Sequence, residues 1–153
     1  MVHWIFNNIA FLLEISAVIF GVFYVVAGIY GWITWKNQKQ QNEVYQHTLL
    51  SHLYIIITGV LLSVGLYFVL STFFNEAQKP LIDSFTTIFS FIATYLTAKK
   101  WIENWIYWIV IDLITTYLYF SRALEIYALL MFFYSFIAIY GYFQWKKIYI
   151  QRK

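Results

Sequence analysis

The residues Leu49–Phe74, LLSHLYIIITGVLLSVGLYFVLSTFF, decide the structural class of this protein. They contain no Asp, Glu, Lys, Arg or Pro. As an α-helix this stretch would be about 39 Å long at 1.5 Å per residue, which exceeds the roughly 30 Å hydrocarbon core of a bilayer. The stretch therefore predicts a transmembrane helix.

Four further apolar stretches surround this one: Ile9–Trp35, Asp83–Ala98, Trp101–Phe120 and Leu124–Trp145. The chain of 153 residues is 62% hydrophobic, 24% aromatic and 11% charged, whereas soluble domains contain about 25% charged residues. The absence of cysteine excludes disulfides and thiolate metal sites. We predict an all-α membrane protein with five transmembrane helices.

The basic residues predict the orientation of the chain in the membrane. If the helices alternate in direction, two basic residues, Lys79 and Arg122, lie on the same side as the N-terminus. The other eight lie on the opposite side: Lys36, Lys39, Lys99, Lys100, Lys146, Lys147, Arg152 and Lys153. Cytoplasmic loops are enriched in Lys and Arg. We therefore expect a multi-pass protein of the inner (cytoplasmic) membrane, with its N-terminus outside and its C-terminus in the cytoplasm.

A cleaved signal peptide is the competing interpretation of the first apolar stretch. A signal peptide begins with a positively charged region and ends at a cleavage site of small residues. The residues before the stretch, MVHWIFNN, contain no Lys or Arg, and no small-x-small site follows. The sequence therefore favours a retained helix.

A repeated sequence motif lies near the ends of the first and last predicted helices. The motif IYG[WY]xxWK occurs at Ile29–Lys36 and again at Ile139–Lys146, 110 residues later. A weaker match relates Leu13-Glu14 to Ile82-Asp83 with an offset of 69 residues. The difference, 41 residues, equals two short transmembrane helices. The two offsets predict parallel repeats of which the first is shortened, although aromatic residues at the membrane interface could also produce the motif twice by chance.

The stretch Trp101–Phe120, WIENWIYWIVIDLITTYLYF, predicts a helix with two unlike faces. At 100° per residue, one arc of about 120° collects its polar and tryptophan side chains: Trp101, Asn104, Trp105, Trp108, Asp112, Thr115, Thr116 and Tyr119. The opposite face carries Ile106, Val110, Leu113, Ile114 and Leu118. A charge at the helix centre costs about 3 kcal/mol when it faces lipid. Asp112 is therefore expected to face protein or water.

The polar face has the chemistry of a site for a small planar cation. The Asp112 carboxylate would attract positive charge, and Trp108 could stack on a ring or provide a cation–π contact of about 0.5–2 kcal/mol. We predict Trp108 and Asp112 as the main substrate contacts, with Asn104 and Tyr134 as lesser ones. A structural hydrogen bond or a protonated carboxyl inside the bundle is the alternative role for Asp112.

The remaining polar residues have ordinary explanations. Glu103 lies beside Lys99 and Lys100, where snorkelling and local pairing account for it. His3, His47 and His52 lack the spacing of metal ligands. The sequence also lacks a phosphate-binding glycine loop and a serine elbow. We therefore predict no enzymatic activity, no cofactor, no metal and no nucleic-acid partner.

These motifs resemble the nicotinamide riboside transporter family, the PnuC-type vitamin transporters. The similarity lies in Ile29-Tyr30-Gly31-Trp32-x-x-Trp35 and in Lys100-Trp101-Ile102-Glu103-Asn104-Trp105-x-x-Trp108-x-x-x-Asp112. That family resembles the sugar-transporting SWEET fold, in which a linker helix joins two three-helix bundles. The resemblance implies facilitated diffusion of an unphosphorylated vitamin, which an intracellular kinase then traps.

The resemblance also implies a division of the chain. Residues 1–35 would be a remnant of the first bundle and 36–48 a cytoplasmic loop. Residues 49–74 would be the linker helix, 83–147 the second three-helix bundle and 148–153 a cytoplasmic tail. Helix Ile9–Trp35 would join the front of the first helix of a repeat to the tail of the third.

Two departures from the family leave alternatives open. Asp112 occupies a position that is Asn in some members, so the substrate could be nicotinamide riboside or thiamine, which is also a cation. A full member has seven helices, whereas this sequence provides five. The chain could therefore work as a homo-oligomer that pairs two C-terminal bundles, or be an inactive, regulatory or structural membrane protein derived from such a transporter.

Overall fold

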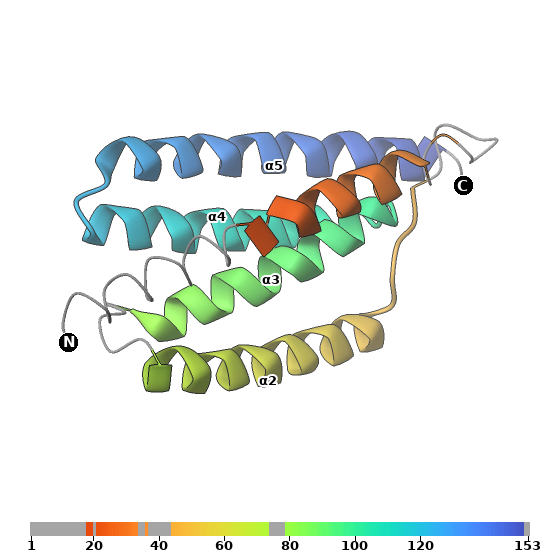
Figure 1. Cartoon of the computed structure of the whole chain (residues 1–153). Helices are drawn as coiled ribbons and strands as arrows, with labels where there is room; N and C mark the ends of the chain where they lie inside the picture. Colours follow the sequence, from red (N-terminus) through yellow and green to blue (C-terminus); the bar gives the residue numbers. More distant parts are fainter. Residues whose placement is uncertain (1–17, 20, 34–35, 37–43, 74–78, 152–153) are drawn as a thin grey trace, which may run out of the picture.

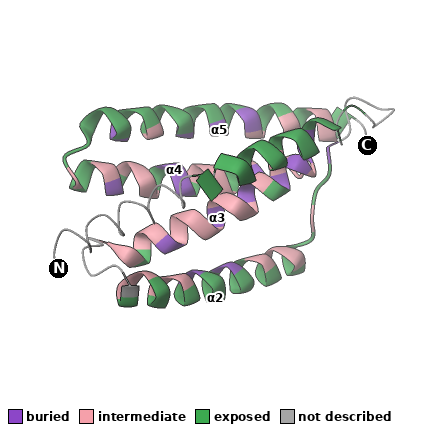
Figure 2. Ribbon diagram, in the orientation of Figure 1, coloured by how far each residue is buried: buried purple, intermediate pink, exposed green. Residues whose placement is uncertain are grey.

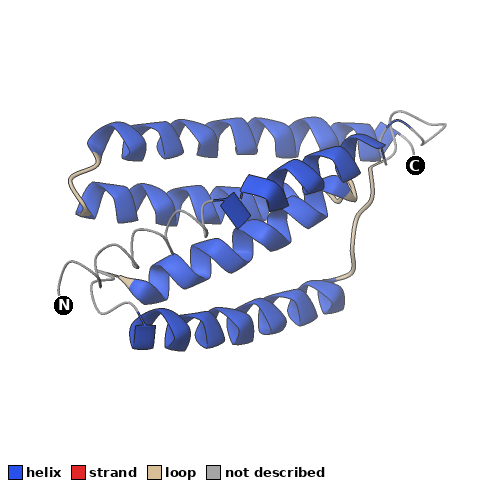
Figure 3. Cartoon of the chain, in the orientation of Figure 1, coloured by secondary structure: helices blue, strands red, loops and turns tan. Residues whose placement is uncertain are grey.

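A computed structural model describes residues 18–19, 21–33, 36, 44–73 and 79–151. The described chain forms a helix at Gly21–Ile33 and four longer helices: α2 (Leu49–Phe73), α3 (Pro80–Ala98), α4 (Asn104–Ser121) and α5 (Glu125–Gln151). These residues contain no β-strand, only an isolated bridge between Tyr45 and Trp101 (Figure 3). The all-α prediction is confirmed. Residues 1–17, which include His3 and the Leu13-Glu14 end of the weaker repeat match, lie outside the described residues.

The long helices lie side by side in chain order (Figure 1). α2 packs on α3, α3 on α4 and α4 on α5, and among these described helices α3 and α5 do not meet. The helix Gly21–Ile33 lies against α3, where the rings of Phe23 and Phe91 are 4.4 Å apart. α4 is therefore the central helix of the C-terminal half.

Many large apolar residues are exposed, especially on α2 and α5, and Figure 2 colours much of both helices as exposed. Leu49 is 88% exposed and Ile126 is 82% exposed, as expected where lipid replaces water. Three described helices are long and apolar enough to cross a membrane, namely α2, α3 and α5. α4 is not among them, because its polar face lowers its hydropathy, but its 18 residues span about 27 Å.

The predicted boundaries of α2 and α3 agree with the structure to within three residues. The predicted boundaries of the first helix, Ile9 and Trp35, lie outside the described residues. The last two helices differ from the prediction. α4 begins at Asn104 rather than Trp101, because residues 99–103 form a turn. α5 continues through Lys146 and Lys147 to Gln151, so the helix extends into the predicted tail.

Both glycines of the repeated motif are buried at helix contacts. A Cβ atom built on Gly31 would lie 3.7 Å from the Cβ of Ala98 on α3. A Cβ built on Gly141 would lie 2.6 Å from the Trp105 ring on α4. The glycine of each motif therefore allows two helices to pack closely. Aromatic residues at a membrane interface, the alternative explanation of the motif, would not require such a glycine. Duplication itself stays a prediction.

The turns after α3 and α4 share one geometry. Lys100 and Ala123 both have a φ of 56°. After α4, the Leu124 N–H donates to the Tyr119 carbonyl at 3.0 Å, and the Ala123 N–H donates to the Phe120 carbonyl at 3.2 Å. This is the Schellman motif, whose left-handed residue is usually glycine. The chain therefore places residues with side chains where glycine is preferred.

Ala123→Gly is expected to raise the free energy of unfolding by about 0.5–1 kcal/mol. The left-handed conformation costs about 1–2 kcal/mol in an L-residue and nothing comparable in glycine, and the greater freedom of glycine in the unfolded chain offsets part of this gain. The exposed Ala123 methyl contributes little packing. Unfolding in mixed micelles with increasing SDS measures the change, and a lower stability of the variant would contradict this account of the turn.

Candidate functional site

A cavity of about 420 Å³ lies between the helix Gly21–Ile33, α3 and α4. The described residues that line it are aromatic, small or hydroxyl-bearing, and none is basic. They are Tyr24, Ala27, Gly28, Gly31, Trp32, Thr94, Thr97, Ala98 and Trp108. Of the four residues predicted to contact a substrate, Trp108 lines this cavity and the other three do not.

Hydrogen bonds fix the Trp108 ring in the cavity wall. Its indole Nε1–H donates to Thr97 Oγ1 at 3.2 Å. Thr97 Oγ1 also lies 2.8 Å from the Ala93 carbonyl and 3.1 Å from Asn104 Oδ1, and its one hydrogen can be donated to either. The ring is thus held in position before any ligand arrives.

Asn104 acts through this network. It has no exposed surface, and its Nδ2 donates to the Trp101 carbonyl. A ligand in the cavity cannot touch Asn104 in this conformation. Asn104 therefore belongs to the hydrogen-bond network that holds Trp108 and is not among the described residues that line the cavity.

Asp112 is 6% exposed, which confirms that it faces protein. No described residue donates a hydrogen bond to its carboxylate. Its partner helix is α5, because Trp105 meets Gly141 and Tyr119 meets Tyr127 along the same pair of helices. On α4, Asp112 lies midway between Trp105 and Tyr119. On α5, Tyr134 lies midway between Gly141 and Tyr127, so Asp112 and Tyr134 are at the same height along the two helices.

The apolar face of α4 is exposed as predicted at three of its five residues, whereas a fourth, Ile114, is half-buried. Ile106, Val110 and Leu113 are each between 44% and 48% exposed. Leu118, which the helical period placed with them, is 3% exposed and therefore buried. Tyr134 is 45% exposed on α5, so the structure does not bring it to the cavity.

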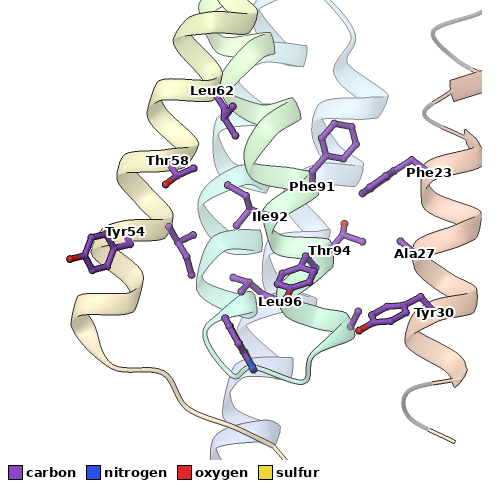
Figure 4. A pocket seen from close by; sticks show the side chains of 14 residues that line it. Phe23, Ala27, Tyr30, Tyr54, Thr58, Leu62, Phe91, Ile92, Thr94 and Leu96 are labelled. Carbon is purple, nitrogen blue, oxygen red and sulfur yellow. The ribbon is translucent and has the colours of Figure 1, made fainter. Parts of the chain in front are cut away.

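A larger apolar cavity, of about 540 Å³, lies between α2, α3 and the helix Gly21–Ile33 (Figure 4). Phe23, Ala27 and Tyr30 point toward α3 from one side, and Thr58 and Leu62 belong to α2 on the other. Lys99 follows α3 at its end, where a hydrogen bond with Tyr30 raises the pKa of the Lys99 ammonium.

Sequence reasoning missed a polar cluster at the turn between α3 and α4. Glu103 is 8% exposed, its Oε1 accepts a hydrogen bond from the His47 N–H at 2.9 Å, and the same oxygen lies 3.6 Å from His52 Nε2. Sequence reasoning considered only Lys99 and Lys100 as neighbours of Glu103, and did not place it beside His47 and His52. The predicted topology could have found this cluster, because it places His52 and Glu103 at the same membrane face.

The segment that precedes α2 is hydrogen-bonded to the turn between α3 and α4. The Tyr45 N–H donates to the Lys100 carbonyl at 3.0 Å, and the Ile102 N–H donates to the Tyr45 carbonyl at 2.9 Å. The rings of His47 and Trp101 lie 3.6 Å apart. These contacts fix the start of α4, which carries Asn104 and Trp108.

On the opposite end of α4, an ion pair joins the helix to α3. Arg122 Nη2 lies 2.6 Å from Asp83 Oδ2, and Lys79 lies 4.5 Å from the centre of the Tyr117 ring. Both ends of α4 are thus tied to other helices by polar contacts.

Comparison with known proteins gives consistent matches. The model of a family described as nicotinamide mononucleotide transporter matches residues 2–147. Curated relatives from Escherichia coli (strain K12) and Shigella flexneri, both named nicotinamide riboside transporter PnuC, are 24% identical over 170 residues. Each alignment covers 92% of this chain and 71% of the relative. Because the aligned stretch is longer than this chain, the relatives contain internal residues that the chain lacks.

A solved structure described as the vitamin B3 transporter PnuC shares the fold. It superposes with a TM-score of 0.64 at 21% identity and covers 85% of this chain. The chain in turn spans 60% of the length of that transporter.

Proposed function

Since the chain belongs to the nicotinamide mononucleotide transporter family, we propose that it carries a small cationic vitamin across the membrane by facilitated diffusion, with nicotinamide riboside as the preferred substrate. The observation that carries the proposal is the Trp108 ring, held by Thr97 in the wall of a cavity between three helices. A fixed indole face suits the flat, positively charged pyridinium ring of this vitamin. No catalytic chemistry is proposed.

The lining of the cavity favours an unphosphorylated substrate. Phosphate groups are usually bound by Arg, Lys or helix N-termini, and no described lining residue is basic. The buried Asp112 carboxylate lies one helical turn from Trp108 and would repel a phosphate. The riboside therefore suits this chain better than the mononucleotide.

Uptake into proteoliposomes tests the proposal. We expect saturable uptake of labelled nicotinamide riboside that excess unlabelled riboside abolishes and excess nicotinamide mononucleotide does not. Thiamine is included as the alternative cation, and stronger competition by thiamine would reassign the substrate. The absence of saturable uptake in folded protein would favour the second candidate, an inactive, regulatory or structural membrane protein derived from a transporter.

The assembly and placement of the chain belong to the same proposal. We propose that α2 is the linker, that α3 to α5 form the second bundle, and that a homo-oligomer provides the missing half. Support comes from α5, which packs on α4 alone among the described long helices and exposes Phe133 and Tyr140 by 56% and 65%. The basic residues support an inner-membrane location with the C-terminus in the cytoplasm.

Asp112→Asn is expected to weaken binding of nicotinamide riboside about three- to tenfold. The substitution keeps the size and hydrogen-bonding capacity of the side chain but removes a charge near the cation, where the medium screens weakly. Equilibrium binding measured by tryptophan quenching gives the ratio. Equal affinities of the variant and the parent protein would remove Asp112 from the site and favour its structural role.

A further inference from the structure

The proposed transport site leaves unused the apolar cavity of about 540 Å³ between the helix Gly21–Ile33, α2 and α3 (Figure 4). This cavity shares three residues with the cavity at Trp108, but it extends to α2, which provides no described lining residue there. No described residue that lines it is charged. Its Thr94 hydroxyl already donates to the Ser90 carbonyl, at 2.8 Å. A polar solute would exchange hydrogen bonds with water for a mostly apolar wall, which costs free energy.

The cavity is long and narrow. It extends along α2 from Tyr54 to Leu62 and along α3 from Phe91 to Ala98, a length of about 11 Å at 1.5 Å per residue. The volume then corresponds to a width of about 8 Å, whereas a helix with its side chains is about 10–12 Å across. The space therefore suits an acyl chain better than a helix from a second copy of the protein.

One end of the cavity carries a positive charge. The Lys99 ammonium lies 5.5 Å from the centre of the Tyr30 ring and 5.9 Å from that of the Tyr95 ring, and both rings line the cavity. The ion pairs of the described chain, His52 with Glu103 and Arg122 with Asp83, do not involve Lys99. The cavity therefore has a cation at its mouth that no described carboxylate neutralises.

The charged end lies at a membrane interface, and the other end lies nearer the middle of the bilayer. Lys99 directly follows the last residue of α3. Phe91 and Leu62 lie at the other end of the cavity (Figure 4), and Phe91 is about 12 Å along the helix from Lys99. A phospholipid has the same arrangement, with its phosphate at the interface and its acyl chains toward the bilayer centre. Basic pockets between transmembrane helices also bind anionic headgroups in other membrane proteins.

We propose that this cavity binds an anionic phospholipid, whose phosphate pairs with Lys99 and whose acyl chain lies between Phe23 and Thr58 and reaches toward Leu62. The surrounding lipid is as apolar as the cavity, so the wall admits the chain and the charge of Lys99 selects the headgroup. A zwitterionic headgroup has its own ammonium beside the phosphate, which competes with Lys99. The site requires only that the protein lies in a membrane, so it is independent of the proposed substrate.

Native mass spectrometry of the detergent-solubilised protein tests the headgroup preference. The probes are phosphatidylglycerol and phosphatidylcholine with identical acyl chains, added in equal amounts. We expect about fivefold more bound phosphatidylglycerol, the ratio that corresponds to about 1 kcal/mol for one lysine near an anionic headgroup. Excess glycerol phosphate, which has the headgroup charge but no acyl chain, should not displace the lipid.

Lys99→Gln should reduce this ratio to about one, because the substitution removes the charge and keeps a side chain of similar length. Lys146→Gln is the matched control. Lys146 also lies over a tyrosine ring, 5.5 Å from the centre of Tyr142, but α5 provides no described lining residue to this cavity, so the ratio should stay near that of the parent protein. Thr58→Phe, which fills the cavity from α2, should lower the ratio as Lys99→Gln does. Thermal unfolding of each variant shows that it is folded.

Photocrosslinking locates the bound lipid in the parent protein. A phosphatidylglycerol with a diazirine in its acyl chain should label peptides that contain Phe23, Thr58 or Phe91, and unlabelled phosphatidylglycerol should compete. Any of four results would overturn the proposal: equal binding of the two lipids, equal loss of preference in Lys99→Gln and Lys146→Gln, displacement by glycerol phosphate, or label confined to α5. The first and the last two need no substitution, so they decide the matter even if a variant fails to fold.

Discussion

Gly141→Ala is expected to lower the free energy of unfolding by about 1–3 kcal/mol, the usual cost of overpacking. The new Cβ atom would lie 2.6 Å from three carbons of the Trp105 ring. The ring cannot simply move away, because Trp145 packs against it edge to face at 5.3 Å. Relief therefore requires α4 and α5 to separate, and with them the contact that holds the C-terminal half together.

Gly65→Ala is the matched control for this prediction. Gly65 also lies in a transmembrane helix, but a Cβ built there has no atom within 4 Å. Alanine is a better helix former than glycine by about 0.5–1 kcal/mol, so this variant should be as stable as the parent protein or more so. SDS titration in mixed micelles, followed by circular dichroism, compares the two. Equal losses of stability would show that the Gly141 contact is not specific.

Trp108→Ala is expected to weaken nicotinamide riboside binding at least tenfold. The substitution removes the ring proposed to face the pyridinium, a contact worth about 2 kcal/mol when water is excluded. Trp108→Phe should lose less, because it keeps an aromatic face and loses only the hydrogen bond to Thr97. The expected order of affinity is therefore parent, Phe variant, Ala variant.

Two further variants show whether the effect belongs to the site. Thr97→Val removes the hydroxyl that holds the indole, so it should weaken binding by less than Trp108→Ala does. Trp145→Phe removes a tryptophan that does not line the cavity and should leave the dissociation constant unchanged. Equilibrium dialysis with labelled riboside avoids dependence on tryptophan fluorescence. If Trp108→Ala bound as well as the parent protein, the cavity at Trp108 would not be the substrate site.

Local patterns in the sequence were sufficient to predict that the chain is helical and which face of α4 is polar. Helical periodicity placed Asp112 on a protein-facing side, and the structure buries it. The same periodicity misplaced Leu118, which lies two helical turns after Ile111, a residue that is buried with Phe89 and Ala93 of α3. A face is determined by the period of the helix, but its width depends on how the neighbouring helix crosses.

The candidate site was only partly predictable for the same reason. Trp108 was identified from its place on the polar face, and it lines a cavity. Asn104 lies on that face too, yet Thr97 and Trp101 take up its amide group. Thr97 belongs to α3, and no pattern within α4 could reveal it as the partner of Trp108.

The sequence by itself determined that the chain is a bundle of membrane helices, where α2 and α3 begin and end to within three residues, and which side of α4 is polar. These properties depend on hydropathy and on the 3.6-residue period, which act over short distances along the chain. The tertiary structure alone decided that Gly141 receives Trp105, that Thr97 holds Trp108 and that Glu103 meets His52. In lipid all apolar faces are alike, so hydrophobicity cannot choose among helix pairings. Close packing and interhelical hydrogen bonds choose them, and they form only when residues far apart in the sequence are brought together.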